Sequence, residues 1–176
     1  MDENGSLYVV DNEVAEVRRY SRGESQGTVV AGGNGRGNRV DQLSNPTYIF
    51  VDRDRSVYVS DNENHRVMKW MEGARQGIVV AGGHEQGNGL TQLAYPLGVV
   101  VDQLGAVYVA DSMNHRIVRW PKGATQGSVI VGGNGKGGES NQLYTPVGLS
   151  FDQHSNLYVV DNGKHQVQKF NIDSNP

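Results

Sequence analysis

The sequence has no cysteine, no long hydrophobic run and no large excess of one charge. Without cysteine the chain has neither a disulfide framework nor thiolate chemistry, although this absence assigns no cellular compartment. The 16 lysines and arginines against 19 aspartates and glutamates give a formal net charge of −3. This balance lacks the basic character that is typical of nucleic-acid-binding domains.

Signals for membrane insertion and export are also lacking. No apolar run approaches the ~20 residues that a transmembrane helix needs. The first residues, MDENGS, lack the basic and apolar regions of a secretory signal peptide. We therefore expect no signal peptide and no membrane partner, and the sequence leaves the localisation unassigned.

Internal repetition is the dominant feature of what is present. The stretch VYVSDNENHRVMKW begins at residue 57, and related copies begin at residues 7, 107 and 157, so successive copies are 50 residues apart. The same spacing relates Pro46, Pro96 and Pro146. A fixed period of this length is typical of repeat architectures, including propellers.

Each repeat contains four short segments with strand character. In the second copy, YIFV at 48–51, VYV at 57–59 and IVVA at 78–81 are apolar runs that are too short for helices. Residues 66–70 alternate polar and apolar side chains, which indicates a strand that folds back on its predecessor. Four strands in each repeat predict one blade of a β-propeller.

The predicted fold is therefore an all-β propeller segment. Residues 1–176 form one domain, with blades at about 1–45, 46–95, 96–145 and 146–176. The first blade lacks its first strand and the last blade lacks its fourth, so two blades are complete and two are incomplete. Because these ends do not add up to one blade, we expect a larger or a self-associating propeller.

Long glycine-rich connections join the fourth strand of each blade to the first strand of the next. An antiparallel meander brings these connections and the turns between second and third strands to the same edge of each sheet. Because the connections vary in charge on a constant scaffold, we expect them to form a recognition surface. The candidate binding residues are Arg36, Arg39, Asn64, His65, Glu85, Asn114, His115, Lys136 and Glu139.

Two sets of recurrent polar residues allow more than one interpretation. Asp11, Asp61, Asp111 and Asp161 follow the second strands. We interpret them as acceptors of N–H groups in their own turns rather than as a Ca²⁺ or acid–base site, because a catalytic site seldom needs four equivalent members. A zinc site built from His65, His115 and His165 is an alternative. Ala15 breaks that series, so we favour turn and packing roles and expect no metal or other cofactor.

The repeats resemble a known family. The segments P-x-G-V-x-V-D, V-Y-V-A-D and N-H-R-I-V-R-W in residues 96–120 are similar to NHL repeats, which are named after an Asn-His-Leu triplet at this place. The triplet reads Asn64-His65-Arg66 and Asn114-His115-Arg116, and drifts to Lys164-His165-Gln166 and Val14-Ala15-Glu16 in the end blades. The resemblance implies a propeller that binds proteins or RNA.

The function that follows is a non-catalytic repeat scaffold that binds a protein or peptide through the loops on one face. An RNA-binding surface is the first alternative, disfavoured by the negative net charge. The second is a zinc-dependent lyase resembling peptidylglycine amidating lyase, whose zinc-binding histidines only His65, His115 and His165 match. The other catalytic groups of that lyase have no assignable counterpart in this sequence.

Overall fold

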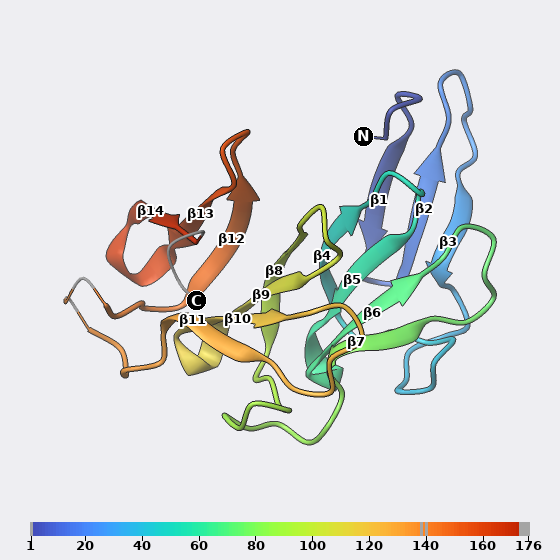
Figure 1. The fold of residues 1–176 in the computed structure, drawn as a ribbon. Helices are drawn as coiled ribbons and strands as arrows, with labels where there is room; N and C mark the ends of the chain where they lie inside the picture. The colour runs from blue at the N-terminus through green and yellow to red at the C-terminus, as the bar shows by residue number, and fades with distance from the viewer. Residues whose placement is uncertain (1, 138, 140, 173–176) are drawn as a thin grey trace.

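The computed structural model describes residues 2–137, 139 and 141–172, and these residues form four antiparallel sheets (Figure 1). The predicted all-β fold is confirmed, with sheets of three, four, four and three strands. In each sheet the strands are paired in chain order, as in a meander. The predicted end of the fourth blade, residues 173–176, lies outside the described residues.

The strand boundaries follow the repeat closely. Blade 1 contains β1 (Leu7–Asp11), β2 (Glu16–Tyr20) and β3 (Thr28–Gly32). Blade 2 contains β4 (Pro46–Val51), β5 (Val57–Asp61), β6 (Arg66–Trp70) and β7 (Ile78–Gly82). Blade 3 contains β8 (Pro96–Val101), β9 (Val107–Asp111), β10 (Arg116–Trp120) and β11 (Ser128–Gly132), and blade 4 contains β12 (Pro146–Phe151), β13 (Asn156–Asp161) and β14 (Gln166–Asn171).

The turn between the second and third strands of blade 1 is longer than the sequence pattern predicts. That pattern places the start of the third strand of blade 1 at about Val14, but β2 begins at Glu16 because Ala15 has a left-handed backbone with φ of 56°. In the other blades a short 3-10 helix fills this turn, at Asn62–Asn64, Ser112–Asn114 and Asn162–Lys164. Each of these helices ends on a histidine with φ of 52° or 53°.

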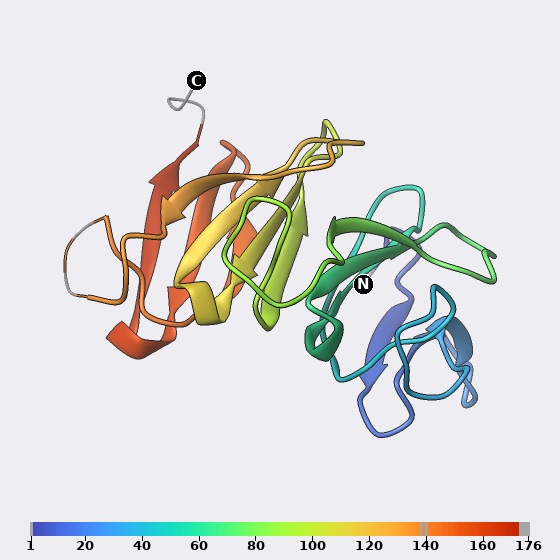
Figure 2. The same ribbon diagram turned by 90° about the horizontal axis from the view of Figure 1, so that it is seen from below.

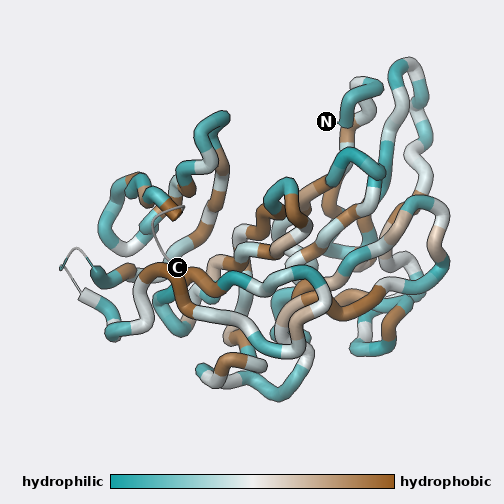
Figure 3. The backbone as a smooth tube through the Cα atoms, in the orientation of Figure 1, coloured by the Kyte–Doolittle hydropathy of each residue, from teal (hydrophilic) through white to brown (hydrophobic). Residues whose placement is uncertain are grey.

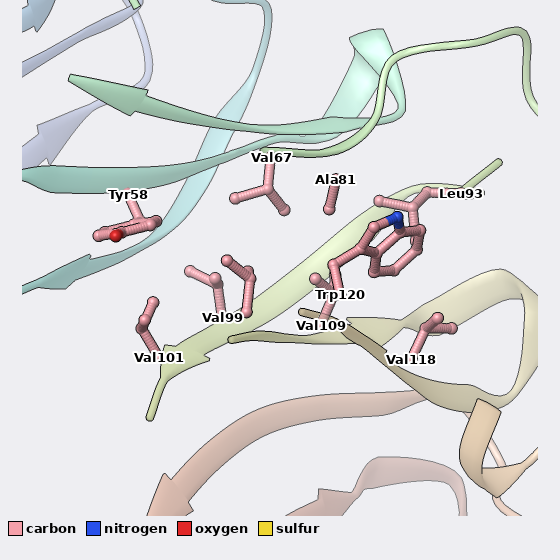
Figure 4. Close-up of a cluster of buried hydrophobic side chains, with 10 residues drawn as sticks. Tyr58, Val67, Ala81, Leu93, Val99, Val101, Val109, Val118 and Trp120 are labelled. Atoms are coloured by element: carbon pink, nitrogen blue, oxygen red, sulfur yellow. The ribbon is translucent and has the colours of Figure 1, made fainter. Parts of the chain in front are cut away.

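The four sheets follow one another in chain order along an open arc (Figure 2). The first strand β8 contacts both β4 and β12 along the inside of this arc. Hydrophobic clusters fill the three interfaces between successive blades. Figure 4 shows the cluster between blades 2 and 3, where Val67 and Ala81 face Val99 and Trp120. Apolar positions accordingly concentrate along the strands (Figure 3).

The outer faces of the two end blades carry the same apolar positions, and no other blade of the described part of the chain packs on them. Val67 is fully buried between blades 2 and 3, whereas the equivalent Val167 of blade 4 is 62% exposed. At the other end, Leu7 is 52% exposed, whereas the equivalent Val57 is 2% exposed. The difference follows from position in the arc, because the residue types are conserved between the repeats. Among the described residues, no helix is long and apolar enough to cross a membrane.

Candidate binding face

The candidate binding face is built from two kinds of connection. The fourth-to-first loops are residues 33–45, 83–95 and 133–145, and the second-to-third turns are residues 12–15, 62–65, 112–115 and 162–165. Hydrogen bonds link each fourth-to-first loop to the second-to-third turn of the following blade, with Glu63 N–H donating to the Ser44 carbonyl at 3.2 Å and Met113 N–H to the Ala94 carbonyl at 3.3 Å. The predicted meeting of these connections at one edge is confirmed.

In each of the two complete blades, a buried arginine holds the preceding fourth-to-first loop in place. Nε of Arg66 donates to the Asp61 carboxylate at 2.7 Å, and its two terminal nitrogens donate to the carbonyls of Asn38, Arg39 and Gln42 at 2.8, 2.9 and 3.1 Å. All of these acceptors except Asp61 belong to the preceding loop. The guanidinium group therefore fixes three carbonyls of that loop at once, as its planar fork of donors allows.

Arg116 repeats this arrangement in blade 3. It donates to Asp111 at 2.7 Å and to the carbonyls of Asn88, Gly89 and Gln92 at 2.6, 3.0 and 3.1 Å. The Arg116 and Asp111 side chains are 6% and 0% exposed. We call this Asp–Arg pair with its loop carbonyls the loop clasp.

In blade 4 a different residue completes the clasp. Gln166 occupies the position of the arginine, and Lys164 supplies the positive charge from two residues earlier. Its ammonium group donates to the carbonyls of Glu139 and Gln142, each at 2.9 Å, and lies 3.9 Å from the Asp161 carboxylate. The cation of blade 4 thus lies two residues earlier in the repeat than Arg66 and Arg116, whereas the carbonyls that it contacts occupy the same part of the loop.

The aspartates act differently from the expectation that they satisfy their own turns. Asp11 does accept the N–H groups of Glu13 and Val14, at 3.0 and 3.3 Å. Asp61 instead accepts the N–H of Ser44 in the preceding loop at 2.6 Å, in addition to the arginine. Asp111 and Asp161 accept the N–H groups of Ala94 and Tyr144 in the same way, at 2.7 and 2.8 Å. The prediction is therefore wrong at Asp61, Asp111 and Asp161, because the preceding loop, distant in sequence, provides the backbone donors.

Burial shapes the electrostatics of the clasp. Burial raises the pKa of the Asp61 and Asp111 carboxyls, and hydrogen bonds from neighbouring N–H groups and the arginine counter part of that rise. No side chain outside the clasp is required to balance its charge. The sequence pattern missed Arg66 and Arg116 as loop-holding residues, although both follow the second-to-third turn at the same repeat position.

The asparagines and histidines of the turns also make structural contacts. Asn64 donates to the carbonyl of Gly37 at 2.9 Å and to Asp61 at 2.8 Å, and Asn114 repeats these bonds with Gly87 and Asp111. Nδ1 of His65 accepts the backbone N–H of Tyr95 at 3.2 Å. The His65 ring packs edge-on against Tyr95 with 4.7 Å between centroids. These three turn residues therefore connect successive blades.

The charged loop residues remain on the outside. Arg36, Arg39, Glu85, Lys136 and Glu139 are all exposed. Arg36 donates to the Asn12 carbonyl at 2.7 Å, and Arg39 forms an ion pair with Asp41 at 2.9 Å. Lys136 lies 5.6 Å from the ring of Tyr144. The structure thus brings the sequence-predicted residues to one face, with the turn residues beneath and the charged residues above.

The histidines do not assemble a metal site within the described residues. In that part of the chain, no group of three or more His, Asp or Glu side chains is arranged to hold a metal ion. The Nδ1 atoms of His65 and His115 are already acceptors for the N–H groups of Tyr95 and Thr145, at 3.2 and 3.1 Å. His165 is exposed on blade 4.

The repeat geometry coincides with a family model. The model described as NHL repeat matches residues 93–120 and 143–170, each of which begins at the buried leucine of a loop and ends in the third strand of a blade. The chain carries NHL repeats. No curated protein matches the sequence.

Solved structures share the fold of this NHL chain at low sequence identity. A protein of unknown function from Bacteroides thetaiotaomicron superposes with a TM-score of 0.76 at 18% identity, over 96% of this chain and 45% of that one. A chain of a nidogen–laminin complex gives 0.72 at 22% identity, over 97% and 57%. A streptogramin B lyase gives 0.64 at 10% identity, over 99% and 53%. The chain therefore spans about half the length of these structures.

His65 is expected to make the stability of the protein depend on pH. Burial lowers the pKa of His65 below its usual 6.5, with Asp111 and Asp61 opposing that shift. Folding therefore favours the neutral ring, so the His65 contribution to stability is complete above about pH 6.5 and is lost as the pH falls below that value. We expect the free energy of unfolding to fall less between pH 7 and pH 5 in His65→Asn than in the unsubstituted protein, as measured by urea denaturation.

Asparagine is the matched replacement because it tolerates the left-handed backbone of residue 65 and does not titrate. The Glu85→Gln variant, which changes an exposed loop carboxylate, provides the comparison for an unrelated titrating group. An equal pH slope in His65→Asn and the unsubstituted protein would show that folding does not lower the pKa of His65.

Proposed function

We propose that the chain is a protein-binding repeat scaffold that holds a protein or peptide partner on the fourth-to-first loops. The observation that carries the proposal is the contrast within each loop. The carbonyls of residues 38, 39 and 42 and of their repeats are fixed by the clasp, whereas exposed positions differ in charge. Position 36 is Arg, its repeats are Gln86 and Lys136, and position 39 is Arg with Gly89 and Glu139 as repeats.

This contrast suits recognition for a physical reason. A loop whose backbone is held by buried hydrogen bonds loses little conformational freedom when a partner binds. Its exposed side chains are free to vary because they contribute little to the fold. The nidogen–laminin complex supports a protein partner, because a chain of that protein–protein complex shares this fold. The negative net charge favours a protein over RNA.

The proposal predicts that loop charges control binding and leave stability unchanged. Peptides are selected from a random phage-displayed library on the unsubstituted protein and titrated by calorimetry. In the variant Arg39→Ala/Glu85→Ala/Lys136→Ala/Glu139→Ala, we expect at least about tenfold weaker binding, because more than 1.4 kcal/mol of contacts is removed. The free energy of unfolding is expected to stay within about 0.5 kcal/mol of the unsubstituted value for each exposed site, in either direction. Arg36 is kept because it donates to the Asn12 carbonyl.

A matched variant changes the opposite end of the blades. Arg53, Asp54 and Gln103 are exposed residues of the turns between first and second strands. Their replacement by alanine removes no contact with a peptide on the loops. We therefore expect peptide affinity to change by less than about twofold, which is well under the 1.4 kcal/mol of a tenfold change. If this variant loses binding and the loop variant retains it, the partner does not lie on the fourth-to-first loops. Selection of RNA rather than peptides in a parallel aptamer screen would also contradict the proposal.

A further inference from the structure

A cation recurs at one position of the third strand in every blade, beside a tyrosine and an aspartate of the same blade. The ammonium group of Lys69, for example, lies 3.4 Å from Asp52 and 4.8 Å from the centre of the Tyr58 ring. The cation of each of the first three blades lines a cleft between that blade and the next. The cations are Arg19, Lys69, Arg119 and Lys169.

A carboxylate bridges the cleft between blades 1 and 2. Glu72 of blade 2 lies 3.4 Å from Arg19 of blade 1 and 2.8 Å from Arg55 of its own blade. Both arginines and Glu72 line this cleft, whose volume is about 490 Å³. The negative charge between the two cations is thus supplied by the protein.

The cleft between blades 2 and 3 lacks this carboxylate. Its equivalent of Glu72 is Lys122, and its equivalent of Arg55 is Gly105. Lys69 and Lys122 both line the cleft, which has a volume of about 1010 Å³. Lys122 makes no ion pair, hydrogen bond or ring contact within the described part of the chain. Lys69 and Lys122 therefore line this cleft without a carboxylate that bridges the two blades, as Glu72 does in the neighbouring cleft.

The carboxylates already present in this cleft do not replace Glu72. Asp52 is bound to Lys69 of its own blade. Asp102 accepts the N–H groups of Leu104 and Ala106, at 2.9 and 2.8 Å, and the Tyr108 hydroxyl at 3.2 Å. Asp54 is exposed in the turn next to Arg53, whose opposite charge offsets it. An anion that bridges Lys69 and Lys122 must therefore come from a bound ligand.

The walls of the same cleft are apolar and accessible. Ile78, Val79 and Leu104 line it and are exposed, and Val80 and Pro121 extend the surface. A volume of about 1010 Å³ falls at the upper end of the range for small-molecule sites. The cleft between blades 3 and 4 differs, because Ile172 takes the place of Lys122 beside a single Arg119.

We propose that the cleft between blades 2 and 3 binds a small carboxylate that carries an apolar chain. The carboxylate lies between Lys69 and Lys122, where Glu72 lies in the preceding cleft, and the chain lies along Ile78, Val79 and Leu104. Charge-assisted hydrogen bonds to two ammonium groups position the head, and burial of the chain provides further affinity. The site is largely separate from the loop face, since His84 is the only one of its lining residues that belongs to a fourth-to-first loop.

Octanoate is the probe, with octylamine as a matched ligand of opposite charge. We expect octanoate to bind with one equivalent and octylamine to bind at least tenfold more weakly, as measured by calorimetry and by shifts of the Leu104 and Lys122 amide signals in NMR spectra. Equal binding of the two ligands, or shifts elsewhere only, would overturn the proposal.

Two reciprocal charge swaps test the assignment within one chain. Lys122→Glu rebuilds the Glu72 arrangement and is expected to lower octanoate affinity at least tenfold, with Lys122→Gln intermediate. Glu72→Lys removes the protein carboxylate from the first cleft and is expected to add one equivalent of octanoate binding. The far-ultraviolet circular dichroism spectra confirm that each variant is folded. Unchanged affinity in both Lys122 variants, or no added equivalent in Glu72→Lys, contradicts the assignment.

Discussion

Replacing Asp111 by alanine is expected to lower the free energy of unfolding by about 3–5 kcal/mol, the range observed when one partner of a buried ion pair is removed. The Arg116 guanidinium would remain buried with its Nε unpaired, and the N–H of Ala94 would lose the acceptor that lies 2.7 Å away. Urea denaturation monitored by tryptophan fluorescence measures this loss, since Trp120 ends the same strand that Arg116 begins.

The matched control is the exposed pair of Arg39 and Asp41. Its nitrogen–oxygen distance of 2.9 Å is close to that of the buried pair, but the Arg39 side chain is 63% exposed. Asp41→Ala is expected to cost less than about 1 kcal/mol because solvent screens the pair. Similar losses in Asp41→Ala and Asp111→Ala would mean that burial does not give the clasp its strength.

The second large effect is expected from Trp120→Ala, at about 3–5 kcal/mol. Trp120 is 2% exposed and belongs to the cluster that joins blade 3 to blade 2. Removal of the indole would leave a cavity at the interface between two rigid sheets, which can close only in part. The same denaturation experiment measures the loss, with circular dichroism as the signal because one of the two tryptophans is removed.

Tyr20 provides the control because it occupies the equivalent position in blade 1. It is only partly buried, because no blade of the described structure packs on that side. Tyr20→Ala is therefore expected to cost less than half as much as Trp120→Ala. An equal cost at both positions would argue against interblade packing as the source of stability.

The fold was predictable because its signals recur at a fixed spacing. The 50-residue period, the apolar runs and the buried leucines of the loops each appear in several copies, and an error in one copy is corrected by the others. Leu43, Leu93 and Leu143 are fully buried, as pinning of the loops requires. Gly82 has φ of 67°, and a Cβ there would collide with the carbonyl oxygen of His65. A glycine at this position is therefore a structural requirement.

The clasp was less accessible to sequence reasoning. Arg66 contacts backbone carbonyls that are 24 to 28 residues earlier in the chain. Every residue has a backbone carbonyl, so residue types in the loop do not indicate which carbonyls accept these bonds. Blade 4 conceals the pattern further, since Lys164 provides the cation from another position. Lys122 points to an anion site only in the structure, where it lines the same cleft as Lys69 and occupies the repeat position of Glu72.

The central claim is that a protein partner contacts the exposed parts of loops that the clasp holds in place. NMR chemical-shift mapping of a selected peptide on the isotope-labelled chain tests it most directly. The account predicts that the largest amide shifts lie in residues 33–45, 83–95 and the described part of 133–145, at the exposed charged positions. Shifts confined to the first-to-second turns at 52–55 and 102–105, with the loop amides unchanged, would contradict it.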